Sequence, residues 1–262
     1  MKRLFTFGCS FTHYHWPTWA DILGKEFDYF ENWGQGGSGN LFILNSLNEC
    51  VIKRNITSDD TVIIKWTDIY RNDTYNSGQW VPGEKYQVGD RCYDDRGYAI
   101  RDLGFINSAR IILDYTGCNY YFLSMVPIST IVPNWGRPKK EVTEKIDDIF
   151  KFYKQSLDLI KPSIYETVFN KDWNSRTLLP KNYSNPKKKR IDFHASTEEH
   201  LEYLDLVLPE MPISDTTRNW VKEIQEHITQ DPQGQDPFDM STYRPWVWSF
   251  GPLWTWKQVK RL

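Results

Sequence analysis

Three residue types that do chemistry together occur in two short segments, far apart in the chain. Ser10 lies in the stretch FGCSFT, directly after an apolar run at 3–7, and Asp192 and His194 lie in the stretch IDFHAS. A serine hydroxyl is a poor nucleophile until a histidine takes its proton and a carboxylate orients that histidine. The pattern therefore predicts acyl transfer, with Ser10 as nucleophile, His194 as general base and Asp192 as the group that orients the imidazole.

A helix start follows the histidine. Ser196 and Glu199 have the spacing of a capping box, in which each side chain satisfies a backbone N–H of the other residue. Apolar residues then recur at helical spacing at Leu201, Leu204 and Leu208. We therefore expect His194 to be held at the rigid entry to a helix.

A glycine-rich turn, GQGGSGN at 34–40, follows a second apolar run at 29–33. In an open α/β sheet, ligands bind at the carboxyl ends of the strands, where the loops gather. Ser10 and this turn both follow expected strands, so we expect them at the same edge of the sheet. A phosphate cradle is the alternative, but the turn does not match a G-x-G-x-x-G helix start well and no lysine follows it.

Short apolar runs alternate with helical patterns along most of the chain. The expected strands are 3–7, 29–33, 61–66 and 119–126. The expected helices are 16–27, 41–51, 104–116 and 146–160, the last ended by Pro162. The run TVIIKW at 61–66 is typical of a parallel strand that is buried on both faces. This alternation predicts an α/β fold: a doubly wound, mostly parallel sheet flanked by helices.

The length of 262 residues fits one large domain, which we place at 1–242. Residues 67–100 interrupt the alternation with glycines, aspartates and aromatic residues, and we interpret them as an insertion on the rim, such as a β-hairpin. Residues 243–262 form an aromatic, Trp-rich tail, which either fills a groove on its own domain or docks on a partner, as a homo-oligomer or in a virion.

Composition limits the partners. With 32 basic and 34 acidic residues, no global charge favours nucleic acid or an anionic membrane. The four cysteines contain no C-x-x-C pair, which favours buried, reduced thiols over a zinc site or a disulfide framework. No apolar run approaches the length of a membrane span, and the N-terminal run is too short for a signal peptide. We expect no metal, no cofactor and a cytoplasmic protein, or a virion-associated one if a phage encodes it.

The segments together resemble the SGNH (GDSL-like) hydrolase superfamily, in a form found in phage-encoded and related bacterial members. FGCS resembles the first block of that family, with Cys9 where aspartate is usual. The stretch 32–38 resembles the second block and IDFHASTEEHLEYL the last. The resemblance implies a flavodoxin-like fold, a triad of Ser10, His194 and Asp192, and an oxyanion hole that includes the backbone N–H groups of Ser10 and Gly37.

Two blocks depart from the family pattern. The third block has Trp66, Thr67 and Asp68 where the family has Gly-x-Asn-Asp, so Thr67 or Asn40 is expected to supply the missing oxyanion donor. The last block reads Asp-x-His in place of Asp-x-x-His, which requires a tighter turn. The residues expected to contact the substrate are His13, Trp66, Asp68 and Arg71.

The resemblance implies a serine esterase, and the aromatic residues of 67–100 together with Trp135 suggest a rim that packs on sugar rings. We therefore expect hydrolysis of an O-acetyl or other small acyl ester on a carbohydrate, although packing within a hairpin is an alternative role for those rings. The missing asparagine and the tail favour a second hypothesis, a catalytically weak or inactive structural or binding protein of this fold, such as a phage virion or tail component. An acyltransferase that uses the same acyl-serine is a third.

Overall fold

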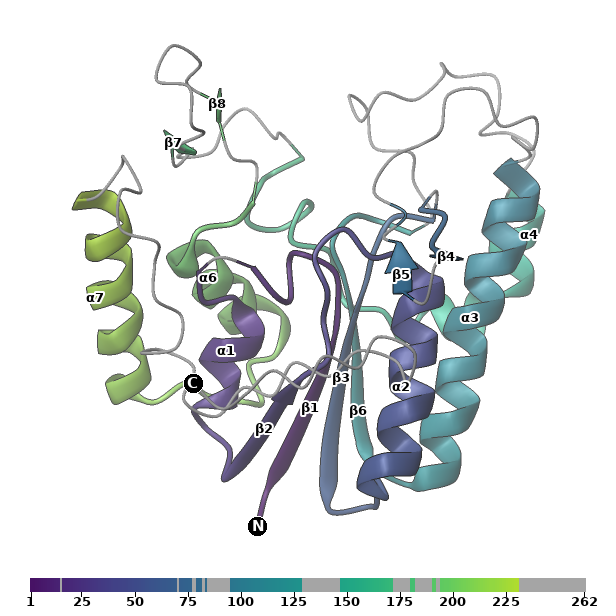
Figure 1. The fold of residues 1–262 in the computed structure, drawn as a ribbon, viewed down its shortest axis with the longest axis horizontal. Helices are drawn as coiled ribbons and strands as arrows, with labels where there is room; N and C mark the ends of the chain where they lie inside the picture. Colours follow the sequence, from purple (N-terminus) through teal and green to yellow (C-terminus); the bar gives the residue numbers. More distant parts are fainter. Residues whose placement is uncertain are drawn as a thin grey trace.

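The computed structural model describes residues 1–14, 16–69, 71–76, 79–81, 83, 95–128, 147–171, 180–181, 190–191 and 194–230. These residues contain a four-stranded sheet in the order β2-β1-β3-β6, in which all neighbouring strands are parallel (Figure 1). The strands are β1 (Arg3–Gly8), β2 (Tyr29–Asn32), β3 (Asp60–Trp66) and β6 (Asn119–Ser124). This order is that of a doubly wound α/β sheet, as the sequence predicted.

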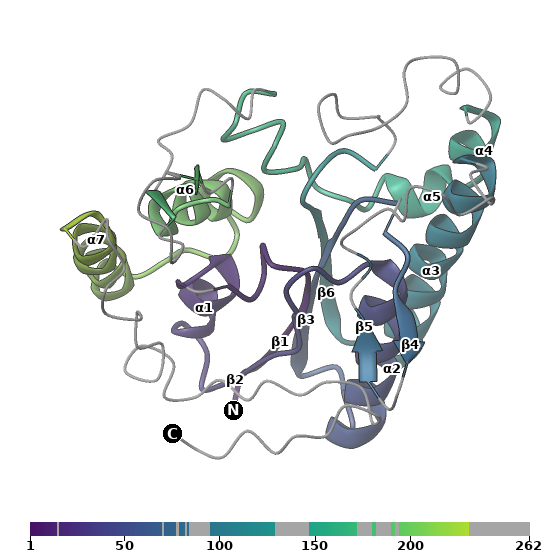
Figure 2. The same cartoon turned by 45° about the horizontal axis from the view of Figure 1, so that its top comes forward.

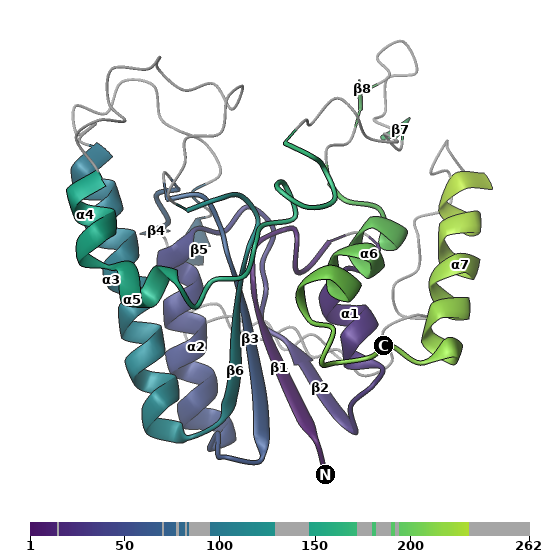
Figure 3. The ribbon, with the colours of Figure 1, turned by 180° about the vertical axis from the view of Figure 1, so that it is seen from behind.

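Helices cover both faces of the sheet (Figures 1 and 3). On one face lie α1 (Trp19–Gly24), α6 (Thr197–Val207) and α7 (Asp215–Gln230). On the other lie α2 (Asn40–Arg54), α3 (Asp95–Thr116), α4 (Asp147–Phe152) and α5 (Lys154–Leu157). Because successive strand side chains point to opposite faces, Ile63 of β3 packs in the first layer while Val62 and Ile64 pack in the second.

Two helices differ from their predicted extents. The helix predicted at 104–116 begins earlier, at Asp95. The helix predicted at 146–160 is divided into α4 and α5, because the chain leaves helical geometry at Tyr153. The division lets the chain turn back to the sheet, where Ile160 forms a parallel bridge with Phe122 and the N–H of Lys161 donates to the Phe122 carbonyl at 2.8 Å.

The rim insertion contains the expected hairpin, with β4 (Thr74–Asn76) antiparallel to β5 (Gln79–Val81). Residues 95–100 belong to α3, so the interruption of the fold ends before residue 100. A further short pair joins β7 (Pro180–Lys181) to β8 (Arg190–Ile191). The domain end at 242, the tail 243–262 and Trp135 lie outside the described residues, so those predictions stay predictions.

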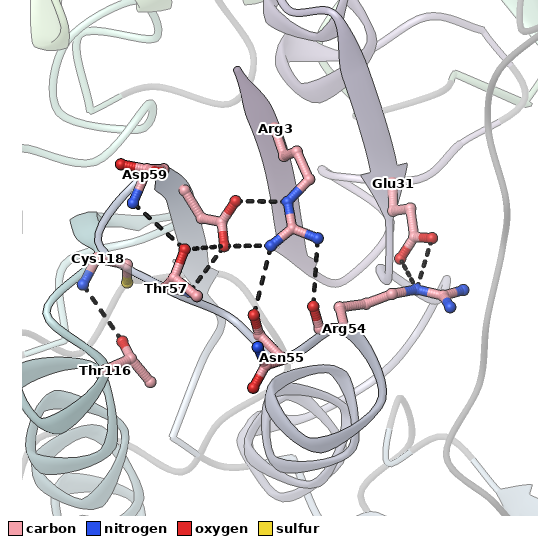
Figure 4. Close-up of polar contacts among 9 residues, drawn as sticks. Arg3, Glu31, Arg54, Asn55, Thr57, Asp59, Thr116 and Cys118 are labelled. Atoms are coloured by element: carbon pink, nitrogen blue, oxygen red, sulfur yellow. Dashed lines mark hydrogen bonds and ion pairs between the residues drawn. The ribbon is translucent and has the colours of Figure 1, made fainter. Parts of the chain in front are cut away.

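The amino ends of the strands are fastened by ion pairs (Figure 4). Arg3 on β1 donates from Nε and Nη2 to the two carboxylate oxygens of Asp60 on β3, at 2.6 and 2.5 Å. Arg54 pairs with the fully buried Glu31 on β2 at 2.8 Å. The first contact joins β1 to β3 and the second ties the end of α2 to β2, at the edge opposite the loops that follow the strands.

Two further expectations concern the described residues. Cys9, Cys50 and Cys118 are buried free thiols, as the cysteine spacing predicted, and Cys92 lies outside the described residues. Among the helices that the structure describes, none combines the length and the apolar character needed to cross a bilayer.

Candidate active site

Ser10 lies in a tight turn at the carboxyl end of β1. The N–H groups of Thr12 and His13 both donate to the Cys9 carbonyl, at 2.8 and 3.1 Å, so the chain begins a helical turn as soon as the strand ends. Gly8 makes this turn possible: a Cβ there would lie 2.1 Å from Thr12 Oγ1 and 3.0 Å from the carbonyl oxygen of Lys65. Ser10 is 8% exposed, so its hydroxyl is held just below the surface.

The imidazole of His194 meets this hydroxyl. His194 Nε2 lies 2.8 Å from Ser10 Oγ, which is a hydrogen bond between residues that are 184 positions apart. Nε2 accepts the serine proton when Nδ1 carries the ring proton. The structure therefore brings together the predicted nucleophile and base. Asp192 lies outside the described residues, so its orienting role stays a prediction.

The position of His194 is fixed by the start of α6. Ser196 is the N-cap, and the predicted capping box is present: the Ser196 N–H donates to Glu199 at 2.7 Å and the Glu199 N–H donates to Ser196 Oγ at 3.2 Å. Trp16 Nε1 donates to the carbonyl of Ala195 at 2.8 Å. The segment after Ser10 is thereby tied to the residue that follows the histidine.

Two aromatic rings from the same segment contact the imidazole. Tyr14 stacks on His194 with ring centroids 3.8 Å apart and planes at 20°, and Phe11 contacts it at 5.1 Å and 36°. We did not identify these residues from the sequence. The signal was the aromatic spacing of Phe11, Tyr14 and Trp16 directly after the serine. The predicted nucleophile and the rings that contact the predicted base thus come from one stretch of chain.

For the acyl transfer that the sequence predicts, replacing Tyr14 by leucine is expected to lower kcat about 3- to 10-fold, because an aromatic pair contributes about 0.5–1.5 kcal/mol beyond its buried area. The loss should fall on kcat and leave KM unchanged, since the ring positions the base. Tyr14→Phe keeps the stack and is the matched control. Equal loss in both variants would show that the phenol hydroxyl matters and the stacking does not.

The glycine-rich turn lies directly against the serine. The Gln35 N–H donates to the Gly8 carbonyl at 3.0 Å, and a Cβ on Gly36 would lie 4.0 Å from Ser10 Cβ. Gly37 has φ 77°, a left-handed conformation that favours glycine. The turn is therefore placed where a backbone N–H can reach an oxygen bound beside Ser10, and the predicted oxyanion role of Gly37 stays a proposal.

The side-chain amide of Asn40 is already hydrogen-bonded within the protein, so it is not free to act as the oxyanion donor that the sequence predicted. Its Oδ1 accepts the Thr67 N–H at 3.0 Å, and its Nδ2 donates to the Thr67 carbonyl at 3.2 Å and to Asp102 Oδ2 at 2.8 Å. Both amide hydrogens are used, so Asn40 ties the start of α2 to the end of β3. Burial raises the pKa of Asp102 to about 7, against the opposing effect of Arg101.

The altered third block divides between the core and the site. Trp66 is fully buried and packs edge-on against Phe122 at 5.6 Å, so the expectation that it contacts substrate is wrong. Thr67 is also fully buried, and its Oγ1 has no hydrogen-bond partner among the described residues, which leaves it as the candidate third donor. Asp68 is buried at 3% exposure, and His13 is partly exposed beside the serine turn.

The rim insertion holds the glycine-rich turn in place. Helix α2 begins after Gly39, which has no side chain to cap it. Asp73 supplies the cap: Oδ1 accepts the N–H groups of Gly39 and Gly83 at 2.7 and 2.9 Å, and Oδ2 accepts that of Phe42 at 2.9 Å. Arg71 Nη1 donates to the Ser38 carbonyl at 2.9 Å. Asp73 was missed, and a glycine at a helix N-cap is the signal that a remote cap was needed.

A lysine is buried beneath the serine turn. Lys65 on β3 is fully buried, and its Nζ has no hydrogen-bond partner in the part of the chain that the structure describes. The Nζ lies 4.2 Å from the ring centroid of Tyr203 and 5.6 Å from that of Phe11. Burial lowers its pKa to about 7. Its position inside the apolar run TVIIKW was the sequence signal.

With this geometry established, the chain can be compared with known proteins. No family model matches it, and no curated protein matches it. Solved structures with a similar course of the chain include a GDSL-like lipase from Bacteroides thetaiotaomicron, with 14% identity, a TM-score of 0.43, and 83% of this chain and 88% of that chain covered. Another is a member of the lipolytic protein G-D-S-L family from Veillonella parvula, with 11% identity and a TM-score of 0.45. The match covers 79% of this chain and 97% of that chain.

At these identities and TM-scores, the likeness says nothing about what this chain does. The activity has to be argued from its own side chains. Among the described residues, no group of three or more His, Cys, Asp or Glu side chains is arranged to hold a metal ion.

Proposed function

We propose that this protein is a serine ester hydrolase of the SGNH type, which works through an acyl-Ser10 intermediate. The single observation that carries the proposal is the 2.8 Å separation of His194 Nε2 from Ser10 Oγ at the carboxyl end of β1. A serine that is nearly buried, yet hydrogen-bonded to an imidazole at a loop edge, has the geometry of an activated nucleophile.

In the first half of the reaction, Ser10 Oγ attacks the ester carbonyl carbon while His194 Nε2 takes the hydroxyl proton. The carbonyl oxygen becomes an oxyanion, for which we assign the N–H groups of Ser10 and Gly37 and the hydroxyl of Thr67 as donors. The bond to the alcohol then breaks, and His194 returns the proton to the departing alcohol oxygen. The acyl group remains on Ser10.

In the second half, a water molecule attacks the acyl carbonyl and gives its proton to His194. The bond to Ser10 Oγ breaks, the serine recovers its proton, and the free acid leaves. Asp192, which directly precedes this region in sequence, is assigned to the Nδ1 side of His194 in both halves. Water is the only co-reactant.

The substrate class we propose is an O-acetyl or other small acyl ester on a carbohydrate. The low exposure of Ser10 supports a small acyl group, because a bulky one has little room to reach the hydroxyl. Tyr75 on the hairpin is half-exposed and packs against Trp80 at 5.8 Å, which supports an aromatic rim next to the glycine-rich turn. Sugar rings pack on such faces through their C–H groups.

A covalent probe tests the proposal without the natural substrate. A fluorophosphonate phosphonylates an activated serine as fluoride leaves, and we expect intact-mass and peptide analysis to find one adduct on Ser10. Ser10→Ala should not be labelled, and His194→Ala should be labelled far more slowly because the serine proton has no acceptor. Absence of labelling in the folded wild-type protein would count against the hydrolase and favour a non-enzymatic role of the fold.

A further inference from the structure

We propose that Arg71 recognises a negatively charged group on the substrate, so that the ester carries a carboxylate or phosphate close to the scissile bond. The inference rests on the proposed function of Ser10 and narrows it to acidic esters, such as an acetylated acidic sugar. It is carried by the burial of Arg71, by the contacts of its guanidinium and by its place between the two segments of the site.

The guanidinium of Arg71 is enclosed but only partly bonded. The residue is 7% exposed. Nη1 donates to the Ser38 carbonyl at 2.9 Å, and Nη2 contacts Met125 Sδ at 4.0 Å, a weak acceptor. A guanidinium has five N–H donors in a planar fork. The contacts of Arg71 with the described part of the chain thus leave most of its donor capacity for another oxygen ligand.

Among the described residues, Arg71 also has no carboxylate partner within ion-pair distance. The ion pairs found in the described ranges include none to Arg71, whereas Arg3, Arg54, Arg96, Arg101, Arg110 and Arg218 each have one. The nearby carboxylate of Asp73 accepts backbone N–H groups at both oxygens. Asp68 is buried in the same turn, but no ion pair joins it to Arg71 within 4.0 Å. A buried charge without a partner destabilises a fold, so its presence favours a functional anion.

The position of Arg71 joins the two halves of the site. Ser38 belongs to the glycine-rich turn that packs on Ser10, and Met125 Sδ lies 3.8 Å from the sulfur of Cys9, the residue before Ser10. A Cβ on Gly39 would lie 2.8 Å from Arg71 Cβ, so the glycine lets the arginine approach the turn. The Arg71 carbonyl accepts Nη2 of Arg101 at 2.8 Å, which fixes its backbone.

The chemistry of the fork identifies the ligand class. Arginine binds carboxylate and phosphate groups through two parallel N–H donors, and it does so best when it is already held in place. A neutral acetyl ester gains nothing from this pair of donors, whereas an anionic ester does.

A matched set of acetyl esters tests the inference. Methyl 4-acetoxybenzoate is neutral, 4-acetoxybenzoate carries a carboxylate, and 4-acetoxyphenyl phosphate carries a phosphate on the same ring. With each rate divided by that for hydroxide-catalysed hydrolysis, we expect kcat/KM of the wild-type protein to favour one anionic ester over the neutral one by about 10- to 100-fold, the size of a charge-assisted hydrogen-bond pair. Which anionic ester is favoured identifies the group.

The variants decide whether Arg71 causes the preference. Arg71→Met should lose the preference for the anionic ester, also where loss of the Ser38 contact lowers the rates for all three esters. Arg71→Lys should keep part of the preference, because the ammonium group retains the charge but not the planar pair of donors. Circular dichroism and a thermal melt check that both variants fold. A wild-type protein without preference, or an Arg71→Met variant that loses both activities equally, would overturn the inference.

A binding measurement separates this inference from the proposed hydrolase activity. In Ser10→Ala protein, titration calorimetry with 4-hydroxybenzoate and with phenyl phosphate should show binding of at least one anion that the Ser10→Ala, Arg71→Met double variant loses. If the protein binds an anion but the wild type hydrolyses no ester, the hydrolase proposal is wrong and the Arg71 inference stands. If the wild type hydrolyses the esters but no anion binds, the hydrolase proposal stands and the Arg71 inference is wrong.

Discussion

Ser10→Ala is expected to lower kcat/KM for p-nitrophenyl acetate by at least about 10³-fold, because the acyl intermediate no longer has an oxygen on which to form. The measurement is a steady-state assay on purified wild-type and variant protein, with near-identical circular dichroism spectra as the control for folding. Ser10 makes one hydrogen bond to His194, so its loss should leave the fold intact. Equal rates in the two proteins would end the hydrolase proposal.

The same assay on His194 tests whether the two residues act as a unit. His194→Ala should lower kcat/KM about as much as Ser10→Ala does. The double variant should have a kcat/KM no lower than that of the slower single variant, because each single change already removes the nucleophilic route. Losses that multiply would mean that the residues act in separate steps. His200, which lies on α6 and contacts Phe11 at 6.3 Å, is the matched control: His200→Gln should keep most of the activity.

Lys65→Met is expected to stabilise the protein below pH 7 by up to about 5 kcal/mol, because burial lowers the pKa of Lys65 from 10.5 to about 7 and each pKa unit corresponds to about 1.4 kcal/mol. Methionine has a similar length, needs no hydrogen bond and fits the space between Tyr203 and Phe11. The loss of the cation–ring contacts reduces the gain without reversing it, since such contacts contribute about 2 kcal/mol or less.

The pH dependence identifies the cause of this stabilisation. Between pH 7 and 10.5 the unfolded chain binds a proton at Lys65 that the folded chain does not, so the wild-type free energy of unfolding rises with pH in that window. Below pH 7 both states are protonated and the full cost of the buried charge remains. The advantage of Lys65→Met should therefore shrink by about 1.4 kcal/mol per pH unit above pH 7.

Urea unfolding of wild type and Lys65→Met at pH 6, 8 and 9.5 measures this difference, and other groups that titrate in the same range cancel because both proteins contain them. A variant that is less stable than wild type at every pH would show that the ammonium group has a stabilising partner. A constant advantage would show that packing, and not the ionisation of Lys65, is responsible.

Local patterns in the sequence were sufficient to predict the layers of the fold. The nearly continuous β-branched run at 61–66 became β3, which is buried along its whole length, because a parallel strand covered by helices on both faces is apolar at most positions. Ser196 and Glu199 predicted the start of α6 because a capping box is decided by four adjacent residues. The local pattern did not predict the break in the helix at Tyr153, which comes before the chain pairs with β6 at Ile160.

The residue types of the candidate site and their order along the chain could also be predicted from the sequence, since Ser10 and His194 each lie beside a recognisable local signal. What each neighbouring side chain does was decided by the tertiary structure. Asn40 and Trp66 were predicted to face a ligand. In the structure, Asn40 is hydrogen-bonded to Thr67 and Trp66 packs in the core. Tyr14, Asp73 and the surroundings of Lys65 depend on loops that meet only after the sheet has formed. Hydrophobic periodicity and helix caps depend on residues that are close together in sequence. The role of a hydrogen-bond donor or a charged group depends instead on residues that are distant in sequence and become its neighbours only in the folded protein.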